Sequence, residues 1–370
     1  MRVGLDARMI DWSGIGRYTE NLIEGFKEFG TDIKPILFCN ENNAGKVLSN
    51  FAFEKHYLNI GVFSLNAPIK LANKLKQYKM EVYHSPHFVV PAGRTKYPIV
   101  VTIHDLIPLI IKETMPNALY RHYYYMLNQI ACRKAAKIIA PSQSTKNDIM
   151  RMLGVTREKI EVVYECSHGQ FRKTSNQQVK KVKEKFAIKG NYIFALGNQK
   201  PNKGIEFLIE AFYKLVSSYS FSHELILTGL PSAKFKGVVK RITKYGLGDK
   251  VKFIGKPLDE ELVALYNGAS AFVFPSLYEG FGLPLLEAMA CETPVVASNR
   301  SSIPEVVRDA ALTVDPSNIE ELVNAIAKVI EDRDLRLKLI ERGLERTKDF
   351  SLEKCVKGTI AVYKKALEKI

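Results

Sequence analysis

Two glutamates flank a glycine-containing turn in the segment FPSLYEGFGLPLLEAMA, residues 274–290. The residues of this segment that could do chemistry are Glu279, Gly280, Phe281, Gly282, Leu283 and Glu287. Glycines let a ligand approach the backbone closely, and the unpaired N–H groups at a helix start attract anions. Carboxylates accept hydrogen bonds from sugar or ribose hydroxyls. The pattern therefore favours a site for a hydroxylated pyrophosphate ligand over a plain turn with two solvated glutamates.

A second candidate is the lysine-containing loop GNQKPNKG at residues 197–204, which follows the apolar run YIFAL. Lysines at the end of a strand can neutralise the negative charge that builds on a departing diphosphate. Lys203 is the first candidate for this role, and Lys200 is the second. The alternative interpretation for both is a solvated lysine loop that binds no ligand.

The first half of the chain contributes a histidine and two glycines. His104 follows the apolar run PIVVTI, where its side chain would face a ligand bound beyond the strand ends. In SGIGRY, residues 13–18, Gly14 and Gly16 would keep a loop low beside a phosphate or an acceptor. A structural histidine and a simple tight turn are the respective alternatives.

Taken together, these segments resemble glycosyltransferase family 4, a group of retaining enzymes with the GT-B fold. The resemblance runs along nearly the whole chain, from GIGRYTENL through VVTIHDLIPL, APSQSTKNDI and ALGNQKPNKGIEFLIEAF to SIPEVV. It implies that Glu279 contacts the transferred sugar and that Glu287 contacts the ribose of the nucleotide. The backbone around Gly280, Phe281, Gly282 and Leu283 would face the sugar and the phosphates.

The same resemblance implies a phosphate-binding role for Lys203 and places His104 near the reacting centre. The arginine that is common in the family before this lysine is absent, because Asn202 occupies that position. Lys200 is the residue available to replace it. Asp332 and Asp334 spell D-x-D, a metal motif in other glycosyltransferases, but they sit in the charged helical pattern EDRDLRLK, and we expect no metal site.

Short apolar runs alternate with helical patterns of 10–15 residues along both halves of the chain. A length of 370 residues exceeds the roughly 250–300 residues at which single cores stop growing. The pattern predicts an α/β protein with two Rossmann-like, doubly wound domains facing a cleft. We expect an acceptor-side domain at 1–172, a nucleotide-sugar-binding domain at 173–350, and a C-terminal helix at 351–370 that could pack back on the first domain.

The net charge of +15 is concentrated in two stretches, 51–150 and 171–200. Nucleic acid, an anionic membrane surface and phosphorylated ligands are the partner classes that such charge could serve. No nucleic-acid recognition module is visible. Several of Lys70, Lys74, Lys76 and Lys79 could share one helical face that contacts an anionic membrane, although the pattern slightly favours an ordinary solvated helix.

The start of the chain lacks a signal-peptide pattern, and no apolar run approaches the ~20 residues of a membrane span. The five cysteines, Cys39, Cys132, Cys166, Cys291 and Cys355, form no C-x-x-C pair and favour reduced thiols. We therefore expect a cytoplasmic protein, with peripheral contact to the inner membrane face as an open option. Two weaker acceptor-site candidates are His84 and His87, which could equally be loop histidines with satisfied hydrogen bonds.

The function expected from the residues and the resemblance is metal-independent, retaining transfer of a hexose, with mannose favoured. The donor would be a nucleotide sugar, with GDP-mannose favoured and a UDP-sugar open, and no cofactor is expected. The acceptor would be a glycan or a lipid-linked glycan, as in polysaccharide biosynthesis. The alternatives are a nucleotide-sugar epimerase or hydrolase of the same fold, and a non-catalytic protein that binds nucleotide sugars.

Overall fold

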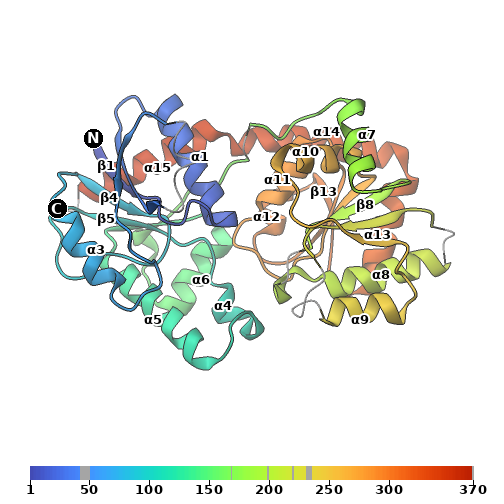
Figure 1. Ribbon diagram of the computed structural model, residues 1–370, viewed down its shortest axis with the longest axis horizontal. Coiled ribbons are helices and arrows are strands. Elements are labelled where there is room, and N and C mark those ends of the chain that lie inside the picture. Colours follow the sequence, from blue (N-terminus) through green and yellow to red (C-terminus); the bar gives the residue numbers. More distant parts are fainter. Residues whose placement is uncertain (42–50, 168, 198–199, 219–220, 231–235, 369–370) are drawn as a thin grey trace. The chain divides into compact units, whose positions relative to one another are not determined.

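The computed structural model describes residues 1–41, 51–167, 169–197, 200–218, 221–230 and 236–368 (Figure 1). The chain divides into two compact units. The first unit comprises Met1–Cys166 with Phe350–Ile370, and the second comprises Ser167–Asp349. The sequence places the first boundary slightly later, at 172/173.

The first unit is built on a sheet of seven parallel strands in the order β3-β2-β1-β4-β5-β6-β7. The strands are β1 (Arg2–Asp6), β2 (Lys34–Cys39), β3 (Glu54–Tyr57), β4 (Val82–Ser85), β5 (Ile99–Thr102), β6 (Lys137–Ala140) and β7 (Ile160–Val162). Successive side chains of a strand point to opposite faces of a sheet. In β5 the buried residues Val100 and Val101 accordingly belong to two separate apolar clusters, one on each face.

Helices cover both faces of this sheet (Figure 1). They are α1 (Ser13–Phe29), α3 (Ala67–Leu75), α4 (Ile107–Ile110), α5 (Ala118–Lys134), α6 (Gln143–Leu153) and α15 (Leu352–Leu367). The last helix, α15, lies against α1, and the contact is close because Gly25 has no side chain. A Cβ atom at Gly25 would lie 2.1 Å from Cγ2 of Val356. The C-terminal helix thus forms part of the core of the first unit.

The second unit has a sheet of six parallel strands in the order β10-β9-β8-β11-β12-β13. The strands are β8 (Tyr192–Ala195), β9 (Glu224–Leu227), β10 (Val251–Phe253), β11 (Ala271–Phe274), β12 (Val295–Ser298) and β13 (Ala311–Val314). In both units the strand order reverses beside the first strand, and ligands of such sheets bind at that switch point. The two expected doubly wound α/β folds are confirmed.

Eight α-helices are described in the second unit. They are α7 (Asn176–Lys185), α8 (Ile205–Ser218), α9 (Lys236–Lys244), α10 (Asp259–Gly268), α11 (Leu283–Ala290), α12 (Ile303–Val307), α13 (Ile319–Glu331) and α14 (Arg333–Thr347), together with the short 3-10 turn η4 (Pro201–Lys203). The basic stretch around 172–190 forms α7, which starts at a capping box between Ser175 and Gln178 and buries no residue fully. It packs on α10, so it belongs to the second unit.

One local expectation about the first unit is wrong. The sequence predicts a loop at Gly14 and Gly16, but α1 already begins at Ser13 and contains both glycines. None of the helices in the described parts of the chain is long and apolar enough to cross a membrane.

Candidate active site

The glycine-containing turn of the second unit joins β11 to α11. Its last residue, Gly282, has a φ of 114°, a left-handed conformation that side chains disfavour. A Cβ atom there would also lie 2.9 Å from Cδ1 of Leu285. Gly282 occupies the N-cap position of α11 and no side chain caps this helix start. The glycine therefore leaves the positive end of the helix dipole open to a ligand.

Glu279 lies in this turn with only 8% of its surface exposed. Its Oε1 accepts a hydrogen bond from Nζ of Lys203 at 2.7 Å and another from the hydroxyl of Ser276. Its backbone is fixed as well, because its N–H donates to Oγ of Ser301 at 2.9 Å and its carbonyl accepts from Oγ of Ser302 at 3.0 Å. Two side chains thus hold the carboxylate of Glu279, and two further serines hold its backbone.

The lysine loop lies directly against this turn. Asn202 is fully buried, and its Nδ2 donates to the carbonyl of Tyr278 at 3.0 Å. The N–H of Leu277 donates to the carbonyl of Asn202 at 2.6 Å. Gly204 permits this contact, since it has a φ of 65° and a Cβ there would lie 2.1 Å from the carbonyl oxygen of Pro275. Asn202, at the position where the family has an arginine, therefore connects the lysine loop to the glycine-containing turn through hydrogen bonds.

Lys203 and Lys200 differ in their surroundings. Lys203 is largely enclosed, with its ammonium 2.7 Å from Glu279 and 5.3 Å from the ring centre of Phe274. An ammonium has three N–H donors, so the ion pair leaves donor capacity for a phosphate. Lys200 is exposed at the start of η4. Residues 198–199 of this loop lie outside the described residues.

Glu287 lies in α11 and is 4% exposed. Its Oε2 accepts a hydrogen bond from the hydroxyl of Tyr266 at 3.0 Å. Tyr266 is itself buried between the rings of Phe194 and Phe272. One oxygen of Glu287 is thus anchored to the core, which fixes the direction in which the carboxylate points.

In the first unit, His104 follows β5 and is held at both ring nitrogens. Its Nδ1 lies 2.7 Å from Oε1 of Glu165, and its Nε2 lies 3.1 Å from the carbonyl oxygen of Pro86. The ring of Tyr18 meets the imidazole edge-on at 4.7 Å. Asp105 accepts a hydrogen bond from the N–H of Ile107 at 2.9 Å, which orients the loop that follows β5.

Gly14 and Gly16 stand in the first turn of α1 with different surroundings. A Cβ atom at Gly14 would meet open space. A Cβ atom at Gly16 would lie 2.2 Å from the carbonyl oxygen of Ile10, so this glycine is needed for the sharp entry into the helix. The N–H of Gly16 donates to the carbonyl of Trp12 at 2.6 Å.

His84 and His87 are structural. Nδ1 of His84 lies 2.7 Å from the hydroxyl of Tyr363, and burial lowers the pKa of His84 to about 3. His87 is 2% exposed, and its Nε2 lies 3.2 Å from Oδ2 of Asp6. Burial opposes ionisation of Asp6, but Arg8 and His87 outweigh it and hold the pKa of Asp6 well below its usual range.

The residues that the structure brings together are therefore Lys203 and Glu279, with Glu287 on the adjoining helix. His104, Gly14 and Gly16 belong to the other unit. Asp332 caps α14 by accepting from the N–H of Leu335 at 2.9 Å. Within the described parts of the chain, no group of three or more His, Cys, Asp or Glu residues could hold a metal ion.

Two parallel sheets, each with a loop at its switch point that carries the candidate residues, give the chain the GT-B fold. Family models show that the class of protein is a glycosyltransferase. Residues 176–346 match the model described as Glycosyl transferases group 1, and residues 12–166 match the one described as Glycosyltransferase Family 4. The chain belongs to glycosyltransferase family 4 and is an enzyme of that class.

Individual relatives agree. O-antigen chain mannosyltransferase B of Escherichia coli is 31% identical, with 95% of this chain and 96% of that protein covered. MMP alpha-(1->4)-mannosyltransferase of Mycolicibacterium hassiacum is 28% identical, with 83% and 75% covered. The crystal structure of HepE from Anabaena in complex with UDP and glucose has a TM-score of 0.78 at 19% identity, covering 98% and 99% of the two chains, and shows the shared fold.

Several residues of the site were missed in the sequence. Ser276, Ser301 and Ser302 fix Glu279, and Tyr266 fixes Glu287. Glu165 holds His104 from 61 positions further along the chain. The only signal available was that Ser301 and Ser302 precede a short helix after a strand, the place where such polar side chains meet a ligand loop.

Proposed function

We propose that this chain transfers mannose from a nucleoside diphosphate sugar to a glycan or lipid-linked glycan acceptor, with retention at the anomeric carbon. The two curated relatives described above are both named as mannosyltransferases, and one is named for the O-antigen chain, a polysaccharide. The donor we propose is GDP-mannose. A UDP-sugar is the alternative, since the structurally similar HepE was solved with UDP and glucose.

One observation carries the proposal: the ammonium of Lys203 and the carboxylate of Glu279 meet at the uncapped start of α11. A diphosphate placed at this helix start would receive the positive end of the dipole and the remaining N–H donors of Lys203. Glu279 would accept hydrogen bonds from hydroxyls of the mannose. Glu287 would accept from the ribose, with the backbone of Gly280 and Phe281 between the two carboxylates.

The proposed chemistry exchanges one C–O bond for another on the same face of the sugar. The bond between the anomeric carbon and the diphosphate oxygen breaks, and the acceptor hydroxyl forms the new bond. The diphosphate oxygen that leaves takes the acceptor proton, so no protein side chain needs to become a covalent nucleophile. Lys203 stabilises the charge that grows on the diphosphate, with Lys200 in a secondary role. Because the protein supplies this cation itself, we propose that no metal or other cofactor is required.

His104, together with Gly14 and Gly16 at the start of α1, would serve the reacting sugar and the acceptor. The ring of His104 is fixed by Glu165 and by the carbonyl of Pro86, so it would present a defined edge to a ligand. Because the ring is already fixed, it loses little rotamer freedom when a substrate binds. The substrate is therefore oriented at a low cost in conformational entropy.

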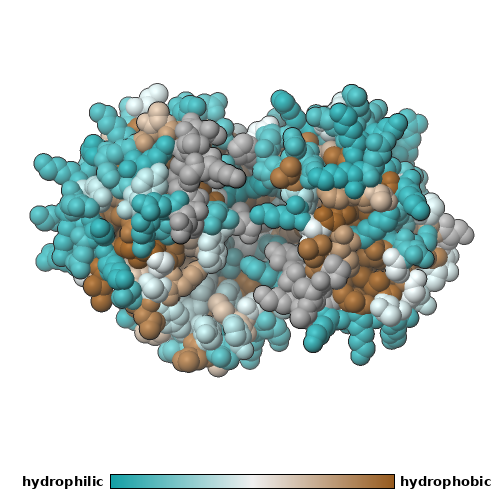
Figure 2. Space-filling model, viewed as in Figure 1, coloured by the Kyte–Doolittle hydropathy of each residue, from teal (hydrophilic) through white to brown (hydrophobic). Residues whose placement is uncertain are grey.

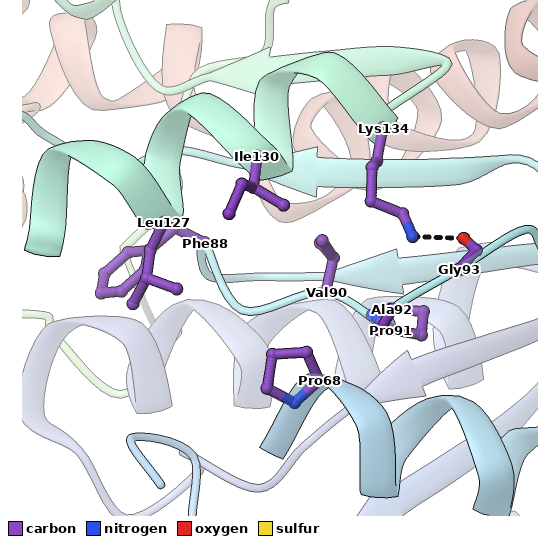
Figure 3. Close-up of a pocket in the computed structure, with 9 residues that line it drawn as sticks. All are labelled: Pro68, Phe88, Val90, Pro91, Ala92, Gly93, Leu127, Ile130 and Lys134. Carbon is purple, nitrogen blue, oxygen red and sulfur yellow. Dashed lines mark hydrogen bonds between the residues drawn. The ribbon is translucent and has the colours of Figure 1, made fainter. Parts of the chain in front are cut away.

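We further propose that the first unit contacts an anionic membrane peripherally, on the cytoplasmic face. Apolar side chains gather on its surface over α3 and α5 (Figure 2), and exposed residues there include Ile69 at 58%, Met126 at 42% and Ile130 at 44%. Ile130 also lines a pocket of about 230 Å³, together with Pro68, Val90 and Leu127 (Figure 3).

Basic side chains lie on the same or adjoining segments as this apolar surface. Lys134 borders the pocket and donates to the carbonyl of Gly93, while burial lowers its pKa. Lys70 and Lys74 of α3, together with Arg94, are exposed. Each basic residue near an anionic membrane surface contributes about 1 kcal/mol to the free energy of binding. The apolar side chains contribute further by inserting into the headgroup region. The protein should therefore co-sediment with vesicles rich in phosphatidylglycerol. The Ile130→Glu variant should not co-sediment with them. Vesicles of phosphatidylcholine should bind neither the parent protein nor the variant.

A two-part experiment tests the proposed transfer. Nucleotide sugars and nucleoside diphosphates are first screened for thermal stabilisation, since a ligand that binds only the native state raises Tm. We expect GDP and GDP-mannose to give the largest shifts, in the presence and absence of EDTA. Radiolabelled mannose should then pass to a mannan acceptor with GDP released. A donor that stabilises the protein but is neither transferred nor released as diphosphate would refute the proposal.

A further inference from the structure

A row of aromatic rings crosses one part of the first unit. The ring centres of Trp12 and Phe63 lie 5.3 Å apart, and those of Phe63 and Phe88 lie 6.0 Å apart. The row continues to Tyr124, whose ring meets Phe88 edge-on at 4.9 Å. These distances fall within the range over which aromatic pairs attract each other, so the rings support one another in place.

The row stands at the edge of the sheet where ligands bind. Trp12 follows β1, Phe63 follows β3 and Phe88 follows β4. Because all strands of this sheet are parallel, the segments that follow them leave from the same edge. In open parallel sheets this carboxyl edge is the ligand-binding edge. Trp12 is also the N-cap residue of α1, immediately before the Gly14–Gly16 turn.

The outer half of the row is open to solvent. Trp12 is 46% exposed and Phe63 is 45% exposed, whereas Tyr124 at the other end is 9% exposed. Large aromatic rings are normally buried when the only requirement is folding. An exposed pair of rings that is anchored from beneath is therefore a surface available to a ligand.

Polar groups flank the exposed rings, and positive charge is absent from the two segments that carry them. Asp11 precedes Trp12, and Ser64 follows Phe63 and donates to Oδ1 of Asn66 at 3.1 Å. The segments 9–16 and 56–69 contain neither lysine nor arginine. The two exposed rings carry no charge and have hydrogen-bonding groups beside them, so they suit a neutral ligand with both an apolar face and hydrogen-bonding edges.

A pyranose ring has this composition. One face presents C–H groups with small positive partial charges, which are attracted to the negative face of an aromatic ring. Its edges present hydroxyls that can bond to carboxylates, amides and hydroxyls. We infer that Trp12 and Phe63 form a platform on which a sugar ring of the acceptor stacks. This inference rests on the proposed function, because it supplies the acceptor chemistry for a donor bound by the second unit.

Trp12 is the single tryptophan of the chain, so tryptophan emission reports directly on the proposed platform. Mannotriose is titrated into the full-length protein while tryptophan emission is followed. We expect a saturable change in emission, and we expect the half-saturation concentration to rise about fivefold or more in Phe63→Ala. A hydroxyl-free amphiphile, octyl dimethylamine oxide below its critical micelle concentration, serves as the comparison and should give no saturable change.

Kinetics provide the second readout. In transfer to mannotriose, Trp12→Ala should raise the acceptor KM about tenfold while the donor KM and the rate of donor hydrolysis stay unchanged. Trp12→Phe keeps an aromatic face and should restore most of the acceptor affinity. Tyr213→Ala removes an exposed ring that stacks on the half-buried Tyr245 at 4.4 Å in the second unit, and should change nothing.

The outcomes separate the two proposals. If emission does not respond to mannotriose, or responds to the amphiphile alone, the platform inference is overturned. An unchanged acceptor KM in Trp12→Ala also overturns the platform inference. If the parent protein still transfers mannose in that case, the proposed function is unaffected. If the parent binds no nucleotide sugar and transfers no mannose, the proposed function is wrong, and the emission titration still decides whether Trp12 and Phe63 hold a sugar.

Discussion

Replacing Lys203 by Gln removes one positive charge from the site and keeps a hydrogen-bond donor of similar length. The ammonium of Lys203 lies 2.7 Å from Oε1 of Glu279, and the two side chains are 15% and 11% exposed. A hydrogen bond to a charged group at such a site contributes about 1.5–3 kcal/mol to stability. A domain of this size loses roughly 2–4 °C of Tm per kcal/mol, so we expect Tm to fall by about 3–12 °C.

The effect on activity should be larger than the effect on folding. If Lys203 faces the diphosphate when charge builds on it, removing the charge costs about 10²–10³-fold in kcat/KM for the donor, as with other preorganised electrostatic groups. Lys203→Arg keeps the charge and should recover part of this loss. Lys240→Gln, at an exposed lysine of α9 in the same unit, makes the same charge change away from the site and should match the parent.

The assay is donor turnover at saturating acceptor, with Tm measured on the same preparations. The reasoning would be refuted by a Lys203→Gln protein that is folded and keeps kcat/KM within threefold of the parent. It would also be refuted if Lys240→Gln were impaired to the same degree, because the loss would then reflect overall charge.

Three further predictions concern how the scaffold holds the site. Gly204→Ala should lower Tm and weaken GDP binding in calorimetry, since a Cβ would lie 2.1 Å from the carbonyl oxygen of Pro275 in a left-handed backbone; unchanged Tm would contradict this. Burial lowers the pKa of His84 to about 3 from 6.5, so the unfolded chain binds more protons between these values. The free energy of unfolding should therefore fall as pH drops from about 6.5 toward 3, and urea titrations of His84→Gln should show a shallower fall; an equal slope would exclude His84 as a cause. Glu165→Gln should lower kcat/KM by about ten- to a hundredfold with little change in Tm, because His104 loses the partner that orients it; full activity would make that contact purely structural.

The fold was predictable because its main signals are local. Apolar runs such as IVVT and AFVF have the length of buried strands, and each precedes a turn and a helix. Both are fully buried central strands in parallel sheets. The glycine-containing turn after Phe274 could likewise be placed between a strand and a helix, because Gly282 and Pro284 mark a helix start.

The start of α1 could not be read correctly from local propensity. Two glycines in five residues argue against a helix, since glycine loses much conformational entropy there. In the structure Gly16 is required because a side chain would collide with the carbonyl oxygen of Ile10. A tertiary contact of the preceding turn therefore outweighed the propensity of the sequence.

The support of the candidate residues also depends on contacts that are distant in sequence. Glu279 forms hydrogen bonds with Ser301, which is 22 positions away in the sequence, and with Lys203, which is 76 positions away. Such partners come together only when three strand ends lie at the same edge of the sheet. Nothing in the spacing of Ser276 or Glu165 distinguishes them from solvated residues before the topology is known.

The measurement that tests the central claim most directly is a crystal structure of the full chain soaked with GDP and, separately, with UDP. We predict density for a diphosphate at the start of α11, within hydrogen-bonding distance of the Lys203 ammonium and of backbone N–H groups near Gly282, with ribose oxygens at Glu287. A nucleoside diphosphate bound elsewhere, with the turn from Glu279 to Leu283 empty, would contradict the account.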